Sequence, residues 1–184
     1  MNRAVFLDRD GVINRVVLRE GRPYPPVSVE QLEWLPGAPE AVTDLRNAGY
    51  VMIVVTNQPD VGKGIQRRDV VEAMHDELCR LFPIHEVKVC YHVDQDGCQC
   101  RKPRPGLLLE AAARWEIDLQ QSFMIGDRWR DIEAGKAAGC KTVWIKWGYA
   151  EQDAVGPDAM VTSLSEAAEL ILSVWHGEPK EGVA

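Results

Sequence analysis

Two acidic residues, one position apart, end the first apolar run of the chain. Asp8 and Asp10 directly follow the apolar residues 5–7, a pattern typical of a buried β-strand that presents polar side chains at its carboxyl end. Two carboxylates placed there repel each other unless a divalent cation lies between them. One can then attack an electrophile while the other transfers a proton. An ordinary Asp-Gly turn is the alternative interpretation, and a calcium loop fits worse because Val12 and Asn14 occupy its next ligand positions.

Polar side chains also follow the later apolar runs. Thr56 and Asn57 follow residues 51–55, and Asp127 follows residues 122–126. Lys102 lies in a polar loop after a third short strand, predicted for residues 86–91. Because the carboxyl ends of parallel strands meet at one edge of a sheet, we expect these side chains to converge there. A chance set of strand ends would not supply acids, a hydroxyl, an amide and an ammonium group together, so the set favours a functional site.

The elements that must position these residues alternate along the chain. Strands are predicted at residues 5–7, 51–55, 86–91, 122–125, 142–147 and 159–161, and helices at 37–48, 68–82, 107–115, 130–138 and 164–174. The alternation predicts an α/β fold, a doubly wound, Rossmann-like parallel sheet with helices on both faces. Residues 13–36, rich in proline and arginine, are expected to form a long loop. We expect a single domain over residues 1–175, without a separate cap domain, and a polar tail over 176–184.

The converging groups are those that phosphoryl transfer requires. Carboxylate oxygens are the ligands that Mg²⁺ prefers, and Asp8, Asp10 and Asp127 are its predicted ligands. The Lys102 ammonium and the Thr56 hydroxyl would neutralise and hydrogen-bond the phosphoryl oxygens. We expect Asp8 to attack phosphorus and form an aspartyl-phosphate. Asp10 is expected to protonate the leaving oxygen and then to deprotonate the attacking water.

Four soft metal ligands lie within eleven residues, in the loop before Lys102. Cys90 and His92 are followed by Cys98 and Cys100, and a Cys₃His set of this kind binds tetrahedral Zn²⁺ and fixes a loop that has no core of its own. A disulfide and unrelated cysteines are the alternatives. Two further cysteines are interpreted as core residues, Cys79 and Cys140.

The composition narrows the class of partner. A net charge of −7 disfavours nucleic-acid binding, including a zinc-binding nucleic-acid module, because phosphate backbones need clustered Lys and Arg. No apolar run is long enough to span a bilayer, and the short N-terminal run does not fit a signal peptide. We therefore expect a cytoplasmic monomer with reduced thiols that binds neither nucleic acid nor membrane.

Four ordered motifs resemble those of the haloacid dehalogenase (HAD) superfamily of phosphatases. They are FLDRDGV, VVTNQ, the lysine of CRKPRPG, and MIGDRWRD, and together they extend over most of the chain from Ala4 to about Trp147. The resemblance implies the same roles for the nucleophile, the acid/base, the phosphate-binding residues and the Mg²⁺ ligand as the derivation above. A receiver-type signalling domain also combines acids, Thr and Lys, but there the Thr and Lys come late in the chain, after a separate phosphorylated Asp. In this chain the acidic pair comes first and Thr56 precedes Lys102, so the order disfavours a receiver domain.

The cysteine-containing loop narrows the resemblance. Together with TNQ and the first motif, Cys-x-His-x₅-Cys-x-Cys-Arg-Lys-Pro is similar to the bacterial heptose-1,7-bisphosphate 7-phosphatases and the related histidinol-phosphatase branch. The resemblance implies a structural zinc that shapes the substrate mouth and a small phosphorylated sugar as substrate. It also implies substrate contacts from Arg101 and Arg128, and Asn57 is a further candidate. Residues 13–36 and the sequence Pro59-Asp60-Val61 depart from the group, and both segments border the substrate rather than the reacting atoms.

Overall fold

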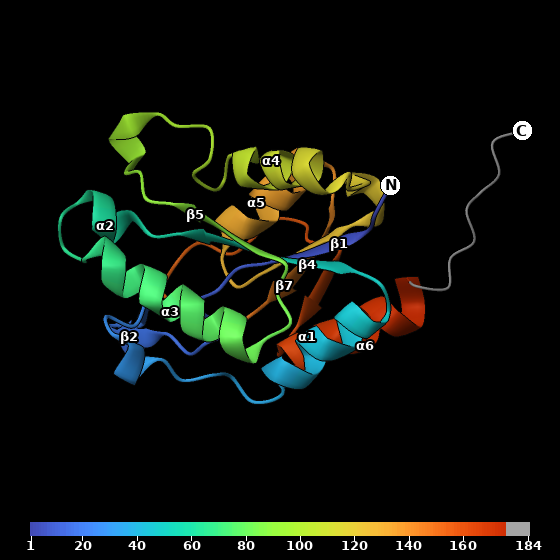
Figure 1. Cartoon of the computed structure of the whole chain (residues 1–184), viewed down its shortest axis with the longest axis horizontal. Helices are drawn as coiled ribbons and strands as arrows, with labels where there is room; N and C mark the ends of the chain where they lie inside the picture. Colours follow the sequence, from blue (N-terminus) through green and yellow to red (C-terminus); the bar gives the residue numbers. More distant parts are fainter. Residues whose placement is uncertain (176–184) are drawn as a thin grey trace, which may run out of the picture.

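A central parallel sheet of six strands forms the middle layer of the computed structural model, which describes residues 1–175 (Figure 1). The strand order is β5-β4-β1-β6-β7-β8, and every neighbouring pair is parallel. The order reverses between β1 and β6, which is where doubly wound sheets place their ligands. The predicted tail over 176–184 lies outside the described residues. The strands are β1 (Ala4–Leu7), β4 (Val51–Asn57), β5 (Glu86–Cys90), β6 (Phe123–Gly126), β7 (Lys141–Ile145) and β8 (Ala159–Val161).

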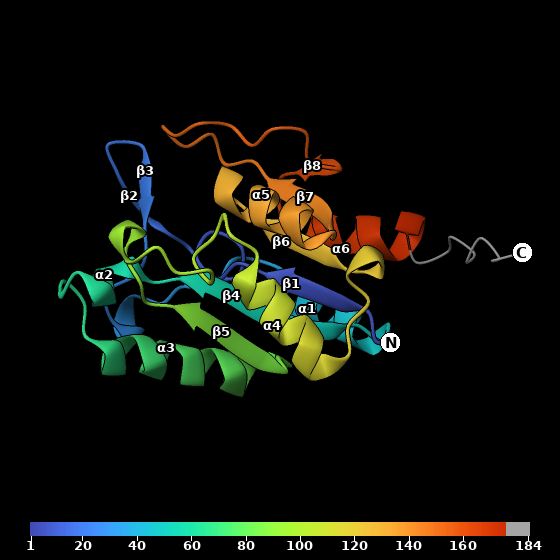
Figure 2. The same cartoon turned by 90° about the horizontal axis from the view of Figure 1, so that it is seen from above.

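Alternate residues of the central strand enter two separate cores. Val5 and Leu7 of β1 pack into one cluster, and Ala4 and Phe6 pack into the other. Because successive side chains of a strand point to opposite faces, a strand that is apolar throughout must be covered on both sides. The first core lies under α1 (Ala38–Asn47), α3 (Arg68–Leu81) and α6 (Leu164–Leu170), and the second lies under α4 (Gly106–Trp115) and α5 (Trp129–Ala138), as Figure 2 shows.

The helices begin and end at residues that suit these positions. Pro39 lies in the first turn of α1, where a missing N–H costs nothing. Ser163 caps α6, because its hydroxyl accepts a hydrogen bond from the Glu166 N–H. Gly139 ends α5 at φ +87°, a backbone conformation that glycine adopts without strain. Among residues 1–175, no helix is long and apolar enough to cross a membrane.

Residues 13–36 contain regular structure that the sequence analysis did not predict. They form an antiparallel hairpin, β2 (Val17–Arg19) and β3 (Arg22–Tyr24), and a 3₁₀ turn over Val29–Gln31. The expectation of a loop was wrong because these strands are short and mostly exposed, and Pro23 within β3 argues against a strand. A two-stranded ribbon tolerates proline, since each strand has a free edge. The hairpin is small. Among the described residues, neither residues 13–36 nor the cysteine-containing loop over 90–101 forms a separate cap domain.

Two smaller expectations also change. Thr56 and Asn57 are the last residues of β4 rather than residues that follow it. A short helix, α2 (Pro59–Gly62), begins two residues later. Cys140 is buried as predicted, but Cys79 is exposed on α3, so its interpretation as a core residue was wrong.

Candidate active site

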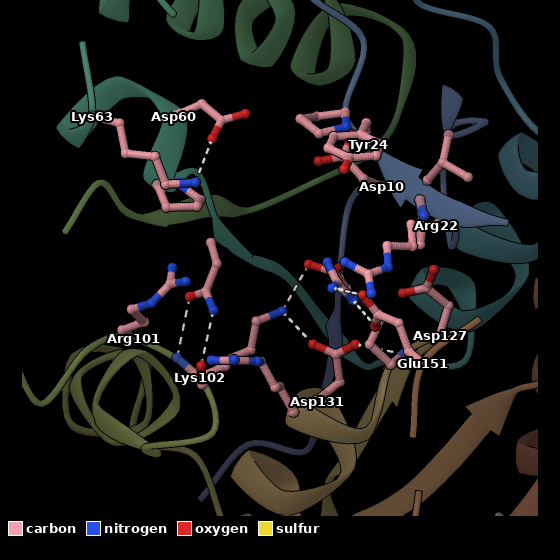
Figure 3. Close-up of a pocket in the computed structure, with 18 residues that line it drawn as sticks. Asp10, Arg22, Tyr24, Asp60, Lys63, Arg101, Lys102, Asp127, Asp131 and Glu151 are labelled. Atoms are coloured by element: carbon pink, nitrogen blue, oxygen red, sulfur yellow. Dashed lines mark hydrogen bonds and ion pairs between the residues drawn. The ribbon is translucent and has the colours of Figure 1, made fainter. Parts of the chain in front are cut away.

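A buried lysine lies at the centre of the strand ends. The Lys102 ammonium is 2.7 Å from Asp8 Oδ1, 2.6 Å from Asp131 Oδ1 and 2.7 Å from the Val55 carbonyl oxygen. Burial by itself lowers the pKa of Lys102, but the charges of Asp131 and Asp8 outweigh it and raise the pKa overall. The lysine therefore stays charged. Its partners are Asp8, which directly follows β1, and Asp131 in the first turn of α5, which Figure 3 shows beside Lys102.

Three buried carboxylates share this single ammonium group. Oxygen atoms of Asp8, Asp127 and Asp131 all lie within 4.8 Å of one another. Burial raises the pKa of Asp8 to about 6, with Lys102 opposing the shift and the charges of Asp131 and Asp10 adding to it. Burial and the charges of Asp8 and Asp131 also raise the pKa of Asp127 well above its ordinary value. The group thus carries an excess of negative charge that a divalent cation would balance.

Asp127 is the residue whose surroundings best fit a bound cation. The Tyr149 hydroxyl faces its carboxylate and opposes the rise of its pKa, but among the described residues no well-aligned hydrogen bond reaches either buried oxygen. Its backbone is held in place, since Trp144 Nε1 donates to the Asp127 carbonyl oxygen over 3.0 Å. Gly11 leaves space for the side chain, because a Cβ there would lie 1.9 Å from Asp127 Oδ2. A buried ionisable group whose oxygens lack such bonds is costly, and Mg²⁺ would satisfy these oxygens.

The carboxylate of Asp10 is not part of this group. It accepts hydrogen bonds from Arg9 Nε and Nη2 over 2.9 to 3.1 Å, from Asn14 Nδ2 over 3.0 Å and from Gln58 Nε2 over 2.8 Å. Burial raises the pKa of Asp10, but the charge of Arg9 and these hydrogen bonds outweigh it, and the pKa lies below its ordinary value. The three clustered carboxylates are thus those of Asp8, Asp127 and Asp131, because Arg9 holds the Asp10 side chain away from them. The choice of Asp8, Asp10 and Asp127 as Mg²⁺ ligands stays a prediction.

Sequence reasoning missed the residues that hold Asp10. Arg9 is completely buried, and its Nη1 lies 3.0 Å from Nε2 of His75, to which the sequence analysis gave no role. Burial, and then the charge of Arg9, lower the pKa of His75 from 6.5 to about 4, so the ring is neutral at pH 7. The only signal in the sequence was an arginine between two acids, which reads equally well as a solvated charge.

Asn57 and Thr56 have different partners. Asn57 contacts the loop that carries Lys102, and Thr56 contacts Gln58, which also donates to Asp10. Asn57 pairs with the backbone of Lys102, donating to its carbonyl oxygen over 3.0 Å and accepting from its N–H over 3.1 Å. Thr56 is buried, and its hydroxyl accepts a hydrogen bond from Gln58 over 3.0 Å. Asn57 lines the pocket, and Thr56 lies beneath it.

A pocket of about 280 Å³ opens above these groups and is rimmed by cations. Two predicted substrate contacts line it, and both are paired with acids: Arg101 Nε donates to Asp94 over 2.6 Å, and Arg128 Nε donates to Glu151 over 2.8 Å. Arg101 Nη1 is buried without a hydrogen-bond partner among residues 1–175. The remaining charged residues on the rim are Arg130 and three residues labelled in Figure 3, which are Arg22, Asp60 and Lys63. The rim suits an anionic substrate of the size of a small sugar phosphate.

The four predicted soft ligands converge beside the pocket. The sulfur atoms of Cys90, Cys98 and Cys100 lie 3.3 to 3.8 Å apart, and His92 Nδ1 is 3.3 Å from Cys100 Sγ. A tetrahedral ion about 2.3 Å from each sulfur would separate the sulfurs by about 3.8 Å. No disulfide forms among the described cysteines. The cluster therefore fits a metal ion, and Arg101 and Lys102 follow its last ligand directly.

Comparison with known proteins agrees with this arrangement. Residues 99–167 match the family model described as HAD-hydrolase-like. Over 148 residues the chain is 40% identical to a D-glycero-beta-D-manno-heptose-1,7-bisphosphate 7-phosphatase of Rhodopseudomonas palustris, with 74% of this chain and 79% of the relative covered. The chain belongs to the HAD-like hydrolases. Since its curated relatives are named phosphatases, it is a HAD-like phosphatase.

Solved structures of related phosphatases share its fold. The D,D-heptose 1,7-bisphosphate phosphatase of B. bronchiseptica, solved with magnesium and phosphate, is 28% identical and has a TM-score of 0.76 over 92% of this chain and 98% of that one. A HAD-like phosphatase of Mesorhizobium loti is also 28% identical, with a TM-score of 0.73 over 98% and 90% of the two chains. The HAD-like fold predicted from the motifs is thereby confirmed.

Proposed function

We propose that this HAD-like phosphatase removes the 7-phosphate of D-glycero-β-D-manno-heptose 1,7-bisphosphate. The observation that carries the proposal is the buried contact of Lys102 with Asp8 at the floor of a pocket rimmed by arginines. Phosphoryl transfer needs a nucleophile beside a fixed positive charge, and a bisphosphate needs further cations at the rim. The names of the curated relatives support the choice of sugar.

In the first half of the reaction we assign the nucleophile to Asp8. Its carboxylate oxygen forms a bond to phosphorus while the bond between phosphorus and the sugar oxygen breaks. The Lys102 ammonium and the Thr56 hydroxyl stabilise the charge that develops on the phosphoryl oxygens, and Asp131 holds Lys102 in place. Asp10 donates a proton to the leaving sugar oxygen. It is ionised in the resting site, and the bound phosphate, as a second negative charge nearby, favours its protonated form.

In the second half, Asp10 accepts a proton from water. The water oxygen bonds to phosphorus, the aspartyl-phosphate bond breaks, and phosphate leaves with the Asp8 carboxylate restored. Mg²⁺, which Asp8 and Asp127 are positioned to hold, supplies positive charge that screens the carboxylate nucleophile from the anionic phosphate. Hydrogen bonds occupy the side-chain oxygens of Asp10. Asp10 therefore stays a proposed Mg²⁺ ligand only through its other atoms.

The remaining assignments concern the edge of the pocket. We assign a structural Zn²⁺ to Cys90, His92, Cys98 and Cys100, and contacts with the second phosphate to Arg101 and Arg128, with Asn57 orienting the lysine loop. We further propose that residues 1–175 form one catalytic domain that acts as a monomer in the cytoplasm, where thiolate ligands stay reduced.

The test is Mg²⁺-dependent phosphate release from the α and β anomers of heptose 1,7-bisphosphate, compared with histidinol phosphate and an aryl phosphate at equal concentration. A large kcat/KM preference for one heptose bisphosphate is expected. A preference for histidinol phosphate would keep the mechanism and replace the substrate. No release from any of these esters would contradict the proposed activity.

A further inference from the structure

The Arg9 and His75 pair is a buried polar contact that the proposed mechanism does not use. Neither residue lines the pocket, so neither can touch the substrate directly. Arg9 is completely buried, and the exposed fraction of His75 is 4%. Burying a guanidinium is costly unless its donors are paired, and here one edge of the group faces Asp10 while Nη1 faces the imidazole. The pair therefore fixes where the Asp10 carboxylate lies.

The chemistry of the contact determines the state of the imidazole. A guanidinium only donates hydrogen bonds, so His75 Nε2 must accept, and the proton of the neutral ring lies on Nδ1. That Nδ1 is 3.6 Å from Glu72 Oε2 and has no hydrogen-bond partner among residues 1–175. Glu72 is held in turn by the Tyr91 hydroxyl, which donates to its Oε1 over 2.6 Å. Tyr91 lies between Cys90 and His92 of the cysteine cluster. The His75 ring is therefore held on the side of Glu72 and Tyr91 as well as on the side of Arg9.

We propose that His75 is a positioning residue, a neutral acceptor that orients Arg9 so that Arg9 holds Asp10 where it can exchange a proton with the leaving oxygen. The inference rests on the proposed function of Asp10. Without an acceptor at the place of Nε2, Arg9 Nη1 becomes a buried donor with no partner, and a guanidinium in that position rotates to find one. Asp10 follows, because three of its five hydrogen bonds come from Arg9.

Three variants of His75 separate positioning from packing. In His75→Gln the side-chain carbonyl oxygen takes the place of Nε2 and can still accept from Arg9. In His75→Asn the amide reaches only as far as Nδ1, and in His75→Leu no acceptor remains. Each full-length variant is assayed with enzyme in excess over ester, following release of the alcohol in the first half-reaction. The two esters are heptose bisphosphate, whose alkoxide must be protonated, and para-nitrophenyl phosphate, whose phenolate leaves without a proton.

Loss of proton transfer predicts an unequal effect on the two esters. We expect the alcohol from heptose bisphosphate to be released about 10- to 100-fold more slowly in His75→Leu and His75→Asn. The same variants should release para-nitrophenolate within a few-fold of the wild-type rate. His75→Gln should recover most of the rate on heptose bisphosphate and also keep the rate on the aryl ester. Thermal unfolding of each variant confirms that the fold is kept.

Two other outcomes overturn the inference. Equal losses on both esters, without recovery in His75→Gln, would show a purely structural residue. Unchanged rates in all three variants would show that Asp10 is positioned without His75. A wild-type enzyme that cleaves neither ester would instead overturn the proposed function, and the inference with it.

Discussion

At the scale of single residues, the site is dominated by the shortage of positive charge around Asp8. One ammonium group, that of Lys102, faces the carboxylates of Asp8 and Asp131 directly, and Asp127 lies in the same group with no well-aligned hydrogen bond to either oxygen among residues 1–175. This arrangement raises the pKa of Asp8 to about 6, and a bound cation would favour its ionised form. It therefore ties reactivity of Asp8 to the metal as well as to Lys102.

Replacing the nucleophile should abolish turnover and leave the fold intact. Asp8→Asn keeps the size of the side chain but removes the attacking carboxylate, and Lys102 retains Asp131 as its partner. We expect phosphate release to fall by more than about 10⁴-fold, with thermal unfolding near that of the wild type. Asp118→Asn, in a distant 3₁₀ cap, is the matched control and should keep wild-type activity. Residual multiple turnover in Asp8→Asn would refute the assignment.

His75 should make stability depend on pH. The pKa of the buried ring is about 4, against 6.5 for an exposed histidine, because burial and the charge of Arg9 disfavour the cation, while Glu72 and Asp10 favour it. The unfolded chain therefore binds a proton that the folded chain resists. The contribution of His75 to the free energy of unfolding is fully present above pH 6.5. It falls as the pH drops towards 4, by up to about 3 kcal/mol.

Urea unfolding at several pH values checks this expectation. His75→Gln does not titrate in this range, so its free energy of unfolding should decline less between pH 6.5 and 4 than that of the wild type. Parallel declines in the two proteins would show that His75 is not the titrating group.

At the scale of elements, the loop over residues 90–101 connects the cluster of Cys90, His92, Cys98 and Cys100 to the pocket. Asp94 in this loop accepts a hydrogen bond from Arg101, the residue directly after the last cysteine of the cluster. The loop has no core of its own apart from the buried Cys90. Its shape must come from the cluster, and the orientation of Arg101 depends on that shape.

Removing the metal should loosen this loop and weaken substrate binding. After chelation, we expect protease cleavage within residues 90–101 and a severalfold rise in KM for the bisphosphate. Cys98→Ser should behave in the same way, whereas Cys79→Ser, at an exposed position outside the cluster, should match the wild type. Unchanged protease sensitivity after chelation would argue against a structural metal.

The sequence predicts the regular elements of the sheet well, and the hairpin not at all. Residues 51–55 are apolar throughout, a pattern typical of a strand that is covered on both faces. The glycine at position 139 marks the end of α5. The strands of the hairpin bury little apolar surface. Their pairing depends on the turn and on contacts with other loops, such as the hydrogen bond from Ala150 N–H to the Gly21 carbonyl oxygen over 2.8 Å, and no local pattern encodes these.

The convergence of the site also followed from strand order, but its internal contacts did not. Topology alone brings Asp8, Lys102 and Asp127 to one edge of the sheet. The direction in which the Asp10 side chain turns depends on Arg9, and the state of Arg9 depends on His75 from α3. Contacts between side chains of separate elements are fixed by packing, and periodicity in the sequence carries no information about them.

At the scale of the whole molecule, an acidic protein must bind an acidic substrate. The net charge of −7 repels a phosphate ester at long range, so binding depends on cations concentrated at the pocket. Most of these are already paired with acids, as Arg101 is with Asp94 and Arg128 is with Glu151. The pairs hold the guanidinium groups in place before the substrate arrives and reduce their net attraction for it.

Removing a rim arginine should therefore impair binding of the second phosphate selectively. For Arg101→Gln and for Arg128→Gln we expect KM for heptose 1,7-bisphosphate to rise about 10-fold, with kcat little changed. KM for heptose 7-phosphate should change much less, because it lacks the 1-phosphate. Arg114→Gln on α4, which loses an ion pair with Glu86 of β5, is the control. Equal increases in KM for both substrates would contradict a contact with the second phosphate.

The position of β1 in the middle of the sheet has a consequence for how the protein is made. β1 leads directly into Asp8 and pairs with β4 on one side and with β6, which begins at Phe123, on the other. The lysine that neutralises Asp8 follows it by 94 residues. During synthesis, this strand and its nucleophile therefore emerge long before their neighbours, and the sheet cannot close around them until β6 has also left the ribosome. Such distant pairings make folding slow and leave early fragments inactive, so the phosphatase becomes competent only after the residues through Asp131 have been synthesised.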